Sequence, residues 1–333
     1  MNRMRIVVTD GYTLNPGDNP WDDIGRMGDL TVHDRTAPDE LIGRCRDADI
    51  LVVNKTQVRE ASMEQLPRLR YITVAATGYD CIDVAAAGRR GIPVSNVPIY
   101  GTDSVAQYVF SAILHICHNI SVHDAAVKAG EWARNPDWSF WKMPLTELAG
   151  KTLGIVGFGR IGRRVGELAH AFGMKVLAHD AYRGSDPGYA PFAWSAPEEL
   201  FAGSDVVSLH CPLTADNRGF VNRRLLERMR PSAMLINASR GPLVNEEDLA
   251  AALNAGALAA AVVDVVAVEP IRAGNPLLAA RNLVITPHLA WATREARQRL
   301  MGTTADNVRA FQGGKPQNVV NASTLRPVGS PGM

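Results

Sequence analysis

The segment GFGRIG, with Gly157, Gly159 and Gly162 in a G-x-G-x-x-G pattern, constrains the fold of this chain most strongly. The apolar run 152–157 that leads into it predicts a buried strand, and the run 160–172 behind it predicts a helix. This order of strand, glycine turn and helix is the one that dinucleotide binding requires. We expect Gly157 to allow the tight turn, Gly159 to let the backbone touch a pyrophosphate, and Gly162 to let helix and strand pack closely. The helix N-terminus would then offer N–H groups to the phosphates.

Strand-like and helix-like runs alternate along the chain, which predicts an α/β fold with parallel sheets. In the second half the expected strands are 152–157, 175–180, 205–210, 233–238, 259–266 and 283–286, and the expected helices are 160–172, 197–203, 222–229, 245–255 and 293–312. In the first hundred residues the expected strands are 4–9, 49–54, 71–76 and 92–95, with helical segments at 38–46 and 60–66. A long apolar-striped helix from about 104, capped by Thr102 or Asp103, separates the two series. We therefore expect two similar lobes, followed by a disordered tail over residues 324–333.

The composition excludes several classes of protein. The 333 residues are 46% hydrophobic with a formal net charge of +1, so a large core is available and nothing attracts nucleic acid or an anionic membrane. No run of about 18 apolar residues predicts a membrane span, and the start lacks the pattern of a signal peptide. The four cysteines form no CxxC pair, which favours reduced thiols in a cytoplasmic protein. His115, His118 and His123 fall on one expected helix without H-E-x-x-H spacing, so we expect no metal site.

Asp180 selects the cofactor. It ends the strand that follows the glycine motif, 18 residues beyond Gly162. A carboxylate at this position accepts hydrogen bonds from the adenosine ribose hydroxyls and repels a 2′-phosphate. Arg183, three residues on, could soften the repulsion of NADP, but we expect the carboxylate to dominate. The sequence therefore predicts NAD as the cofactor.

Three ionisable side chains come shortly after three expected strands, at the edge where sheets of this kind bind ligands. They are Arg240, Glu269 and His288. Each alone has an ordinary interpretation, as a loop anchor, a helix cap or a hydrogen-bonded loop histidine. Together, where the nicotinamide end of the cofactor should lie, they predict a catalytic site.

Hydride exchange with a 2-oxo acid is the chemistry that would use these three residues. A carbonyl that accepts hydride becomes an alkoxide unless a proton arrives, and His288 can supply that proton near neutral pH. Glu269, if it contacts the other imidazole nitrogen, orients the ring and favours imidazolium. Arg240 can hold the substrate carboxylate and polarise the carbonyl with its planar fork of donors. In the oxidative direction His288 becomes the base.

Longer blocks of sequence resemble the D-isomer-specific 2-hydroxyacid dehydrogenases. The blocks are GFGRIG, HCPLTADNRGF, LINASRGPLVNEEDL, AAAVVDVVAVEP and LVITPHLAW, together with AATGYDCIDVAAAGRRGIPVSNVPIYGTDSVAQYVF nearer the start. The likeness covers about residues 50–320, and the catalytic Arg, Glu and His of the family fall on Arg240, Glu269 and His288.

The resemblance also implies binding residues. The backbone N–H groups of Ala76, Thr77 and Gly78 would bind the substrate carboxylate, with Arg240 and His288 as further substrate contacts. The implied cofactor contacts are Thr102, Gly157, Gly159, Arg160, Ile161, Gly162, Asp180, Cys211, Pro212, Ala238, Arg240, Asp264 and His288.

The domain organisation that the resemblance implies differs from the order of the chain. A flavodoxin-like substrate domain would consist of residues 1–101 and a C-terminal return over 289–333, which includes the flexible tail. The NAD-binding Rossmann domain, residues 102–288, would be inserted between them. Members of the family are usually homodimers through the nucleotide domain, so the resemblance implies a homodimer.

Within the family, VPIYGTDSVAQ and the loop SFWK look most like the glycerate dehydrogenases, also called hydroxypyruvate reductases. One departure is Asn217, where Thr is usual before Arg, which would alter a cofactor-side contact modestly. In related glyoxylate/hydroxypyruvate reductases a loop tryptophan reaches the active site of the partner. Trp138 or Trp141 either does so here or packs at the dimer interface.

Three rival interpretations remain open from the sequence. A formate dehydrogenase-like enzyme shares the scaffold but has glutamine where this chain has Glu269. A phosphoglycerate dehydrogenase would need a basic cluster near residues 54–59, which contain only Lys55 and Arg59. An NAD-sensing protein like the dehydrogenase-related corepressors would keep all three catalytic residues, and is distinguished by binding NADH without turning over 2-oxo acids.

Overall fold

The computed structural model describes residues 3–325, and the chain folds into two compact units. One unit comprises Met1–Gly101 and Ala292–Met333, and the other comprises Thr102–Trp291. The boundaries between these units lie after Gly101 and after Trp291.

The first unit is built on a parallel sheet of five strands in the order β2-β1-β3-β4-β5. This is the doubly wound order typical of flavodoxin-like folds, as predicted. The strands are β1 Arg5–Val8, β2 Asp29–Val32, β3 Ile50–Val53, β4 Tyr71–Val74 and β5 Val94–Ser95. The helices of this unit are α1 Asp22–Gly25, α2 Leu41–Cys45, α3 Glu60–Glu64, α4 Val84–Arg89 and α11 Arg294–Gln312, with a 3-10 turn at Ala322–Thr324.

The C-terminal segment completes the first unit. Helix α11 packs on the sheet, where the Phe311 ring stacks on the buried Tyr71 ring with centroids 4.3 Å apart. The chain then runs along β5, where Val320 N donates to Val94 O and Ser95 Oγ donates to Gln317 O. Residues distant in sequence thus share one core, which explains why residues 1–101 and the C-terminal segment form one unit.

The second unit contains a parallel sheet of seven strands in the order β12-β11-β10-β9-β6-β7-β8. Strand order reverses between β6 and β9, which is the point where sheets of the Rossmann type bind dinucleotides. The strands are β6 Thr152–Val156, β7 Lys175–His179, β8 Phe192–Trp194, β9 Val206–Leu209, β10 Met234–Asn237, β11 Ala260–Val263 and β12 Leu283–Ile285. The helices are α5 Thr102–His118, α6 Ile120–Lys128, α7 Arg160–Ala171, α8 Pro197–Gly203, α9 Arg223–Leu226 and α10 Glu246–Asn254, with 3-10 turns at Trp132–Arg134, Gly241–Leu243 and Pro276–Ala279.

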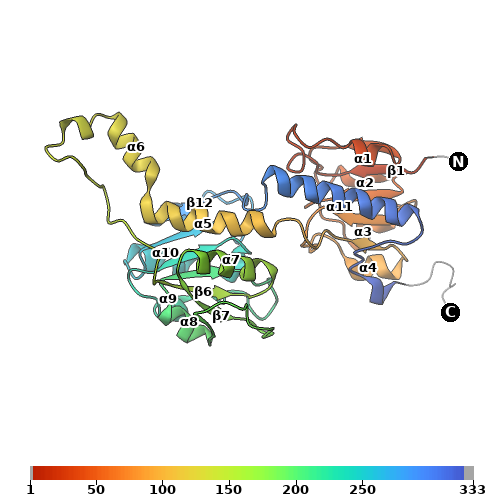
Figure 1. Cartoon of the computed structure of the whole chain (residues 1–333). Coiled ribbons are helices and arrows are strands. Elements are labelled where there is room, and N and C mark those ends of the chain that lie inside the picture. Colours follow the sequence, from red (N-terminus) through yellow and green to blue (C-terminus); the bar gives the residue numbers. More distant parts are fainter. Residues whose placement is uncertain (1–2, 326–333) are drawn as a thin grey trace. The chain divides into compact units, whose positions relative to one another are not determined.

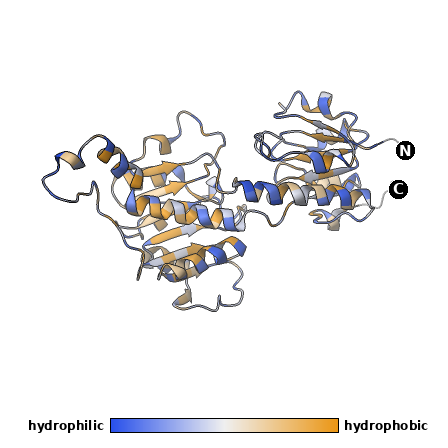
Figure 2. Ribbon diagram, turned by 45° about the horizontal axis from the view of Figure 1, so that its top comes forward, coloured by the Kyte–Doolittle hydropathy of each residue, from blue (hydrophilic) through white to orange (hydrophobic). Residues whose placement is uncertain are grey.

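Two cores cover the two faces of this second sheet. Successive strand residues point to opposite faces, so Ile236 packs in the core below α5 and α7 while Leu235 packs in the core below α8, α9 and α10. Both faces are therefore apolar, as a sheet covered by helices on both sides requires. Figure 2 shows the strands as the most apolar elements and the helices as mixed. Figure 1 shows α6 and the loop after it extending away from this sheet.

The structure corrects some of the sequence predictions. Strands β2 and β8 were not expected, and both lie at the edge of their sheets, where short strands of mixed polarity suffice. The long helix after residue 101 ends at His118 because Asn119 adopts a left-handed conformation with φ 44°. His123 therefore lies on α6, away from the helix of His115 and His118. Thr102 and Asp103 are the first two residues of α5 and do not precede it as a cap would.

Two further predictions concern the tail and the membrane. Of the tail predicted to be disordered, residues 326–333 lie outside the described residues. Between residues 3 and 325 no single helix has both the length and the hydropathy of a membrane span. The bent pair α5–α6, with 48° between its helices, meets that test by length and composition only.

Candidate active site

The glycine motif forms a tight turn between β6 and α7. Gly157 has φ 94°, and a Cβ on this residue would lie 2.3 Å from Cys211 N. A Cβ on Gly162 would lie 2.1 Å from Gly157 O, so helix and strand are in close contact there. A Cβ on Gly159 would meet nothing within 4 Å, which leaves open space beside the backbone. The turn and the first N–H groups of α7 fit a pyrophosphate, because they offer donors and a partial positive charge.

Asp180 follows β7 and faces this turn. Its Oδ2 accepts a hydrogen bond from Phe158 N at 2.6 Å, and its Oδ1 accepts one from Tyr182 N at 3.0 Å. These two bonds hold the carboxylate at the end of the strand next to β6, with lone pairs remaining on both oxygens. The Asp180 carboxylate is therefore placed where it could accept hydrogen bonds from the ribose hydroxyls of a dinucleotide.

The loops after β9 and β10 are tied to each other. Ser239 Oγ donates to Cys211 O at 2.7 Å, and Asn237 Nδ2 donates to Arg240 O at 3.0 Å. Gly241 lies against the backbone after β11, since a Cβ there would be 2.0 Å from Val266 C. The Arg240 backbone is thus fixed, while one guanidinium nitrogen donates to Ser239 O and the side chain is only half-buried.

Glu269 and His288 are in direct contact. Their Oε2 and Nδ1 atoms lie 2.7 Å apart, with the side chains 38% and 27% exposed. The other carboxylate oxygen of Glu269 accepts a hydrogen bond from Val266 N. This contact uses Nδ1 of the imidazole and leaves Nε2 on the opposite side of the ring. A carboxylate–imidazole pair of this kind can hold the ring in one orientation while Nε2 takes or gives a proton.

Asp264, at the end of β11, is buried among donors. Its Oδ1 accepts from Thr286 Oγ1 at 2.6 Å and from Leu289 N at 2.8 Å, and its Oδ2 accepts from Ala290 N at 2.8 Å. Burial raises the pKa of this carboxyl, while the hydrogen bonds from Thr286, Ala290 and Leu289 and the charge of His288 act to lower it. Asp264, an implied cofactor contact, is thus also bonded to the segment around His288, which no sequence signal indicates.

The implied cofactor and catalytic residues of the second unit follow the strand order along one edge of its sheet. From one side to the other, the strand exits carry His288 after β12, Asp264 and Glu269 after β11, Ala238 and Arg240 after β10, Cys211 and Pro212 after β9, the glycine motif with Arg160 and Ile161 after β6, and Asp180 after β7. All seven strands run parallel, so every one of these exits lies at the carboxyl edge. An elongated dinucleotide fits such a row, with its adenosine end at Asp180 and its reacting end at His288.

The remaining implied residues lie elsewhere. Thr102 is the first residue of α5. Ala76, Thr77 and Gly78 follow β4 in the first unit, where Asn96 Nδ2 donates to Thr77 O and Thr77 Oγ1 donates to Val97 O. Within residues 3–325 the backbone N–H groups of Ala76, Thr77 and Gly78 donate no hydrogen bond. Such unused donors fit an anionic group.

Sequence reasoning missed several polar residues that support these edges. Asp10, after β1, accepts from Asn54 N at 2.8 Å, Thr56 N at 2.9 Å and also from Lys55 N. His210, after β9, lies 2.8 Å from Ser208 Oγ, and loss of solvent lowers its pKa to about 3. Both come within two residues of the end of a strand, which is the signal that could have found them. No group of three or more His, Cys, Asp and Glu side chains within residues 3–325 could hold a metal ion.

Comparison with known proteins shows which family this chain resembles. The model of the D-isomer specific 2-hydroxyacid dehydrogenase NAD binding domain matches residues 110–290, more than half of the chain.

Individual relatives match over most of their length. A hydroxypyruvate reductase of Blautia hydrogenotrophica is 47% identical over 321 residues, which cover 96% of this chain and 100% of that protein. A glycerate dehydrogenase of Methylorubrum extorquens is 40% identical over 86% of this chain and 89% of its own. Among solved structures, an NADPH-dependent glyoxylate/hydroxypyruvate reductase of Sinorhizobium meliloti, in complex with NADP and malonate, has a TM-score of 0.80 at 27% identity, covering 99% of this chain and 100% of that one.

Proposed function

We propose a reaction for this chain, which belongs to the D-isomer-specific 2-hydroxyacid dehydrogenase family: the NAD-dependent reduction of hydroxypyruvate or glyoxylate to the 2-hydroxyacid, and the reverse oxidation. That the chain is an oxidoreductase using a nicotinamide dinucleotide follows from the family and from its relatives. The choice of substrate, of NAD over NADP and of individual residue roles is our proposal.

The contact between Glu269 and His288 is the observation that carries the proposed mechanism. The bound dinucleotide supplies the hydride. His288 gives a proton from Nε2 to the substrate oxygen during reduction and takes it back during oxidation. Glu269, 2.7 Å from Nδ1, keeps the ring oriented and balances the charge of the imidazolium. An imidazole suits both directions because it gains and loses a proton near neutral pH.

Arg240 and the loop after β4 are assigned to the substrate carboxylate. The guanidinium of Arg240 offers a planar fork of donors that matches a carboxylate and can also polarise the neighbouring carbonyl. The N–H groups of Ala76, Thr77 and Gly78 carry no other hydrogen bond among the described residues, which supports their assignment to an anion.

NAD is proposed over NADP because of Asp180. A carboxylate beside the ribose accepts hydrogen bonds from two hydroxyls but repels a phosphate. Arg183 does not neutralise it directly, since its guanidinium lies over the Trp194 ring at 6.0 Å. The solved relative with NADP shows that the fold also accommodates the phosphorylated cofactor, so this assignment depends on Asp180 itself.

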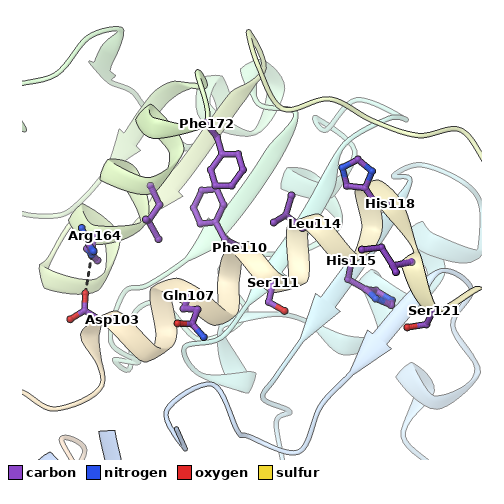
Figure 3. Close-up of a pocket in the computed structure, with 12 residues that line it drawn as sticks. Asp103, Gln107, Phe110, Ser111, Leu114, His115, His118, Ser121, Arg164 and Phe172 are labelled. Atoms are coloured by element: carbon purple, nitrogen blue, oxygen red, sulfur yellow. Dashed lines mark hydrogen bonds and ion pairs between the residues drawn. The ribbon is translucent and has the colours of Figure 1, made fainter. Parts of the chain in front are cut away.

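We also propose that the enzyme is a homodimer through the second unit. Helices α5 and α7 border a cavity of about 740 Å³, in which Phe110 stacks on Phe172 and Leu114 lies alongside (Figure 3). In the same unit, an arm formed by residues 119–147 exposes 89% of Trp138, 66% of Trp141 and 74% of Ile120. The exposed apolar side chains of this arm, together with the apolar part of the cavity, are typical of a contact between copies.

The arm holds a defined shape by its own contacts. Trp132 Nε1 donates to Trp138 O, Lys142 Nζ pairs with Glu131, and Lys142 N donates to His123 Nε2. It can therefore present its tryptophans to the cavity of a second copy without first becoming ordered. Sedimentation should give a dimer, which the pair Trp138→Ala and Trp141→Ala should weaken and the exposed Leu278→Ala should leave intact. A monomeric wild-type protein would contradict the proposal.

A cytoplasmic location is proposed from the thiols. Cys45, Cys81 and Cys117 are buried and Cys211 is partly buried, and all four are free. Unpaired thiols are usual where the medium keeps them reduced.

A substrate panel tests the proposed function. Loss of NADH absorbance would be followed with hydroxypyruvate, glyoxylate, pyruvate and bulkier 2-oxo acids, and repeated with NADPH. We expect NADH-dependent turnover of hydroxypyruvate and glyoxylate, and weaker turnover of bulkier 2-oxo acids. NADH binding without turnover of any 2-oxo acid would instead indicate a sensing protein of the corepressor kind.

A further inference from the structure

A chain of hydrogen bonds links helix α5 to the segment that carries His288. Tyr108 on α5 lies with its hydroxyl 2.6 Å from Thr286 Oγ1, and Thr286 Oγ1 lies 2.6 Å from Asp264 Oδ1. Asp264 in turn accepts from the backbone N–H groups of Leu289 and Ala290. All of these residues lie in the second unit, and none of these contacts involves Nε2 of His288.

The chemistry of the groups fixes the direction of the chain. An ionised carboxylate only accepts hydrogen bonds, so the single hydroxyl proton of Thr286 must point at Asp264. Thr286 Oγ1 can then only accept from Tyr108, whose phenol must be the donor. Each hydroxyl thus has one orientation, and the Tyr108 phenol strengthens the bond that Thr286 gives to Asp264.

The segment held in this way needs such support. His288 has φ 54°, a left-handed conformation that a residue other than glycine adopts at some cost. Its N–H donates to Asp264 O at 2.7 Å, and the next two N–H groups donate to the Asp264 carboxylate. A strained conformation persists only where its surroundings define it strongly, and here the surroundings are Asp264 and the groups that orient it.

We propose that Tyr108 and Thr286 are positioning residues for His288, which act through the Asp264 carboxylate to hold the segment after β12 in its left-handed turn. The proposal rests on the function proposed above, because it explains how the proton donor of that reaction is kept in place. Neither residue carries out the chemistry. Their effect should be much larger on turnover than on cofactor affinity.

Because charged groups act near Asp264, the proposal also predicts a change in the pH dependence of kcat/KM. Among the described residues, the charge of His288, from the segment after β12, lowers the pKa of Asp264, and the charge of Asp264 raises the pKa of Tyr108 on α5. The Thr286 hydrogen bond lowers the pKa of Asp264, which burial raises. Without that bond Asp264 would be protonated at a higher pH, and a neutral carboxyl accepts the two remaining bonds, from Leu289 N and Ala290 N, more weakly than a carboxylate does. The acid limb of the kcat/KM profile should then move to higher pH.

Four variants separate positioning from folding. Tyr108→Phe removes one hydroxyl and keeps the ring, Thr286→Val removes the second hydroxyl at constant shape, and Thr286→Ser restores it. Tyr189→Phe is the matched control, because the Tyr189 hydroxyl is buried in the same unit and bonds to nothing among the described residues. Each would be measured for kcat, KM, NADH affinity, pH profile and thermal unfolding.

We expect kcat to fall about 3–10-fold in Tyr108→Phe and about 10–100-fold in Thr286→Val, with NADH affinity within about twofold. Thr286→Ser and Tyr189→Phe should match the wild type, and only Thr286→Val should shift the acid limb clearly. If Thr286→Val kept wild-type turnover and pH profile, or if Thr286→Ser were as impaired as Thr286→Val, the proposal would be wrong.

Amide hydrogen exchange makes the test independent of the substrate. The Leu289 and Ala290 amides should exchange at least about tenfold faster in Thr286→Val than in the wild type or in Tyr189→Phe, while global unfolding stays similar. Unchanged exchange at these two amides would overturn the positioning role even if no substrate were turned over. An inactive wild type with the expected exchange pattern would overturn only the proposed function.

Discussion

The two sheets end in carboxyl edges of different kinds. In the second unit, ionisable side chains dominate the edge, and the pair Glu269–His288 has its Nε2 atom available for chemistry. In the first unit, the carboxylate of Asp10, which follows β1, is occupied by backbone N–H groups of the segment after β3. What the first edge offers to a ligand is backbone, in the N–H groups of Ala76, Thr77 and Gly78.

Under the proposed function, the two edges would have different roles. Proton transfer needs a group that titrates near neutral pH, which an imidazole side chain provides and a backbone amide does not. Binding an anion needs donors at fixed positions, which backbone N–H groups provide with little entropy left to lose. Changes at the second edge should therefore affect the chemical step most, and changes at the first should affect folding and substrate affinity.

The largest effect is expected at His288. Replacing it by Ala removes the proton donor, so turnover should fall roughly 10²-fold or more while NADH affinity stays near normal. Stopped-flow NADH oxidation and equilibrium NADH titration would measure the two. His170→Ala, an exposed histidine on α7 in the same unit, serves as the control and should keep wild-type turnover. Normal turnover by His288→Ala would contradict the assignment of the chemical step to the second edge.

At the first edge, Asp10→Ala should act on folding. It removes the acceptor for three backbone N–H groups and for Thr9 Oγ1, so the free energy of unfolding should fall by about 2 kcal/mol. Urea unfolding would show this, and KM should rise more than kcat falls. Asp39→Ala, an exposed carboxylate of the same unit, should change stability little. A large loss of kcat with unchanged stability would mean that Asp10 has a chemical role.

His210 tests whether every ionisable side chain at the second edge takes part in the chemical step. Burial lowers its pKa from 6.5 to about 3, so the folded state binds this proton less tightly than the unfolded state does. Its contribution to stability is therefore present above pH 6.5 and is lost as the pH falls towards 3. The loss should amount to roughly 2 kcal/mol at pH 5.

The measurement is urea unfolding of the wild type and His210→Asn at pH 7.5 and pH 5. The variant should lose less stability than the wild type between the two values, with turnover at pH 7.5 within about threefold of normal. Equal losses in both proteins would show that His210 does not cause the acid sensitivity.

The smallest effect is expected at Asp180, at the adenosine end of the second edge. Asp180→Asn keeps an acceptor oxygen for Phe158 N but loses the charge that repels a phosphate. NADH affinity should fall about tenfold or less, and the preference for NADH over NADPH should narrow by a similar factor. Asp186→Asn, in the following loop, is the control. A wild type that prefers NADPH, or a preference unchanged in Asp180→Asn, would contradict the assignment of NAD.

Much of the second edge could be located from the sequence, because its polar side chains come within a few residues of the ends of apolar strands. The glycine motif, Asp180, Arg240, Glu269 and His288 all carry such a local signal. The Rossmann and flavodoxin-like orders of the sheets agree with the fold that the resemblance implied. The two missed strands, β2 and β8, lie at sheet edges, where burial places weak demands on sequence.

What the sequence could not reveal are contacts between residues far apart in the chain. The bonds from Tyr108 through Thr286 to Asp264 join three elements, and no spacing rule connects residues 108, 264 and 286. The left-handed turns at Asn119 and His288 depend on surrounding hydrogen bonds rather than on glycine. The three bonds to Asp10 from the backbone of residues 54–56 are likewise a product of strand order, which only tertiary structure defines.

A crystal structure with NAD and an unreactive 2-oxo acid analogue would test the central claim most directly. Our account predicts that Nε2 of His288 lies within hydrogen-bonding distance, about 3 Å, of the analogue's carbonyl oxygen while Nδ1 keeps its contact with Glu269. An imidazole on the order of 12 Å from that oxygen in a closed, liganded state, several times the reach of a hydrogen bond, would contradict it.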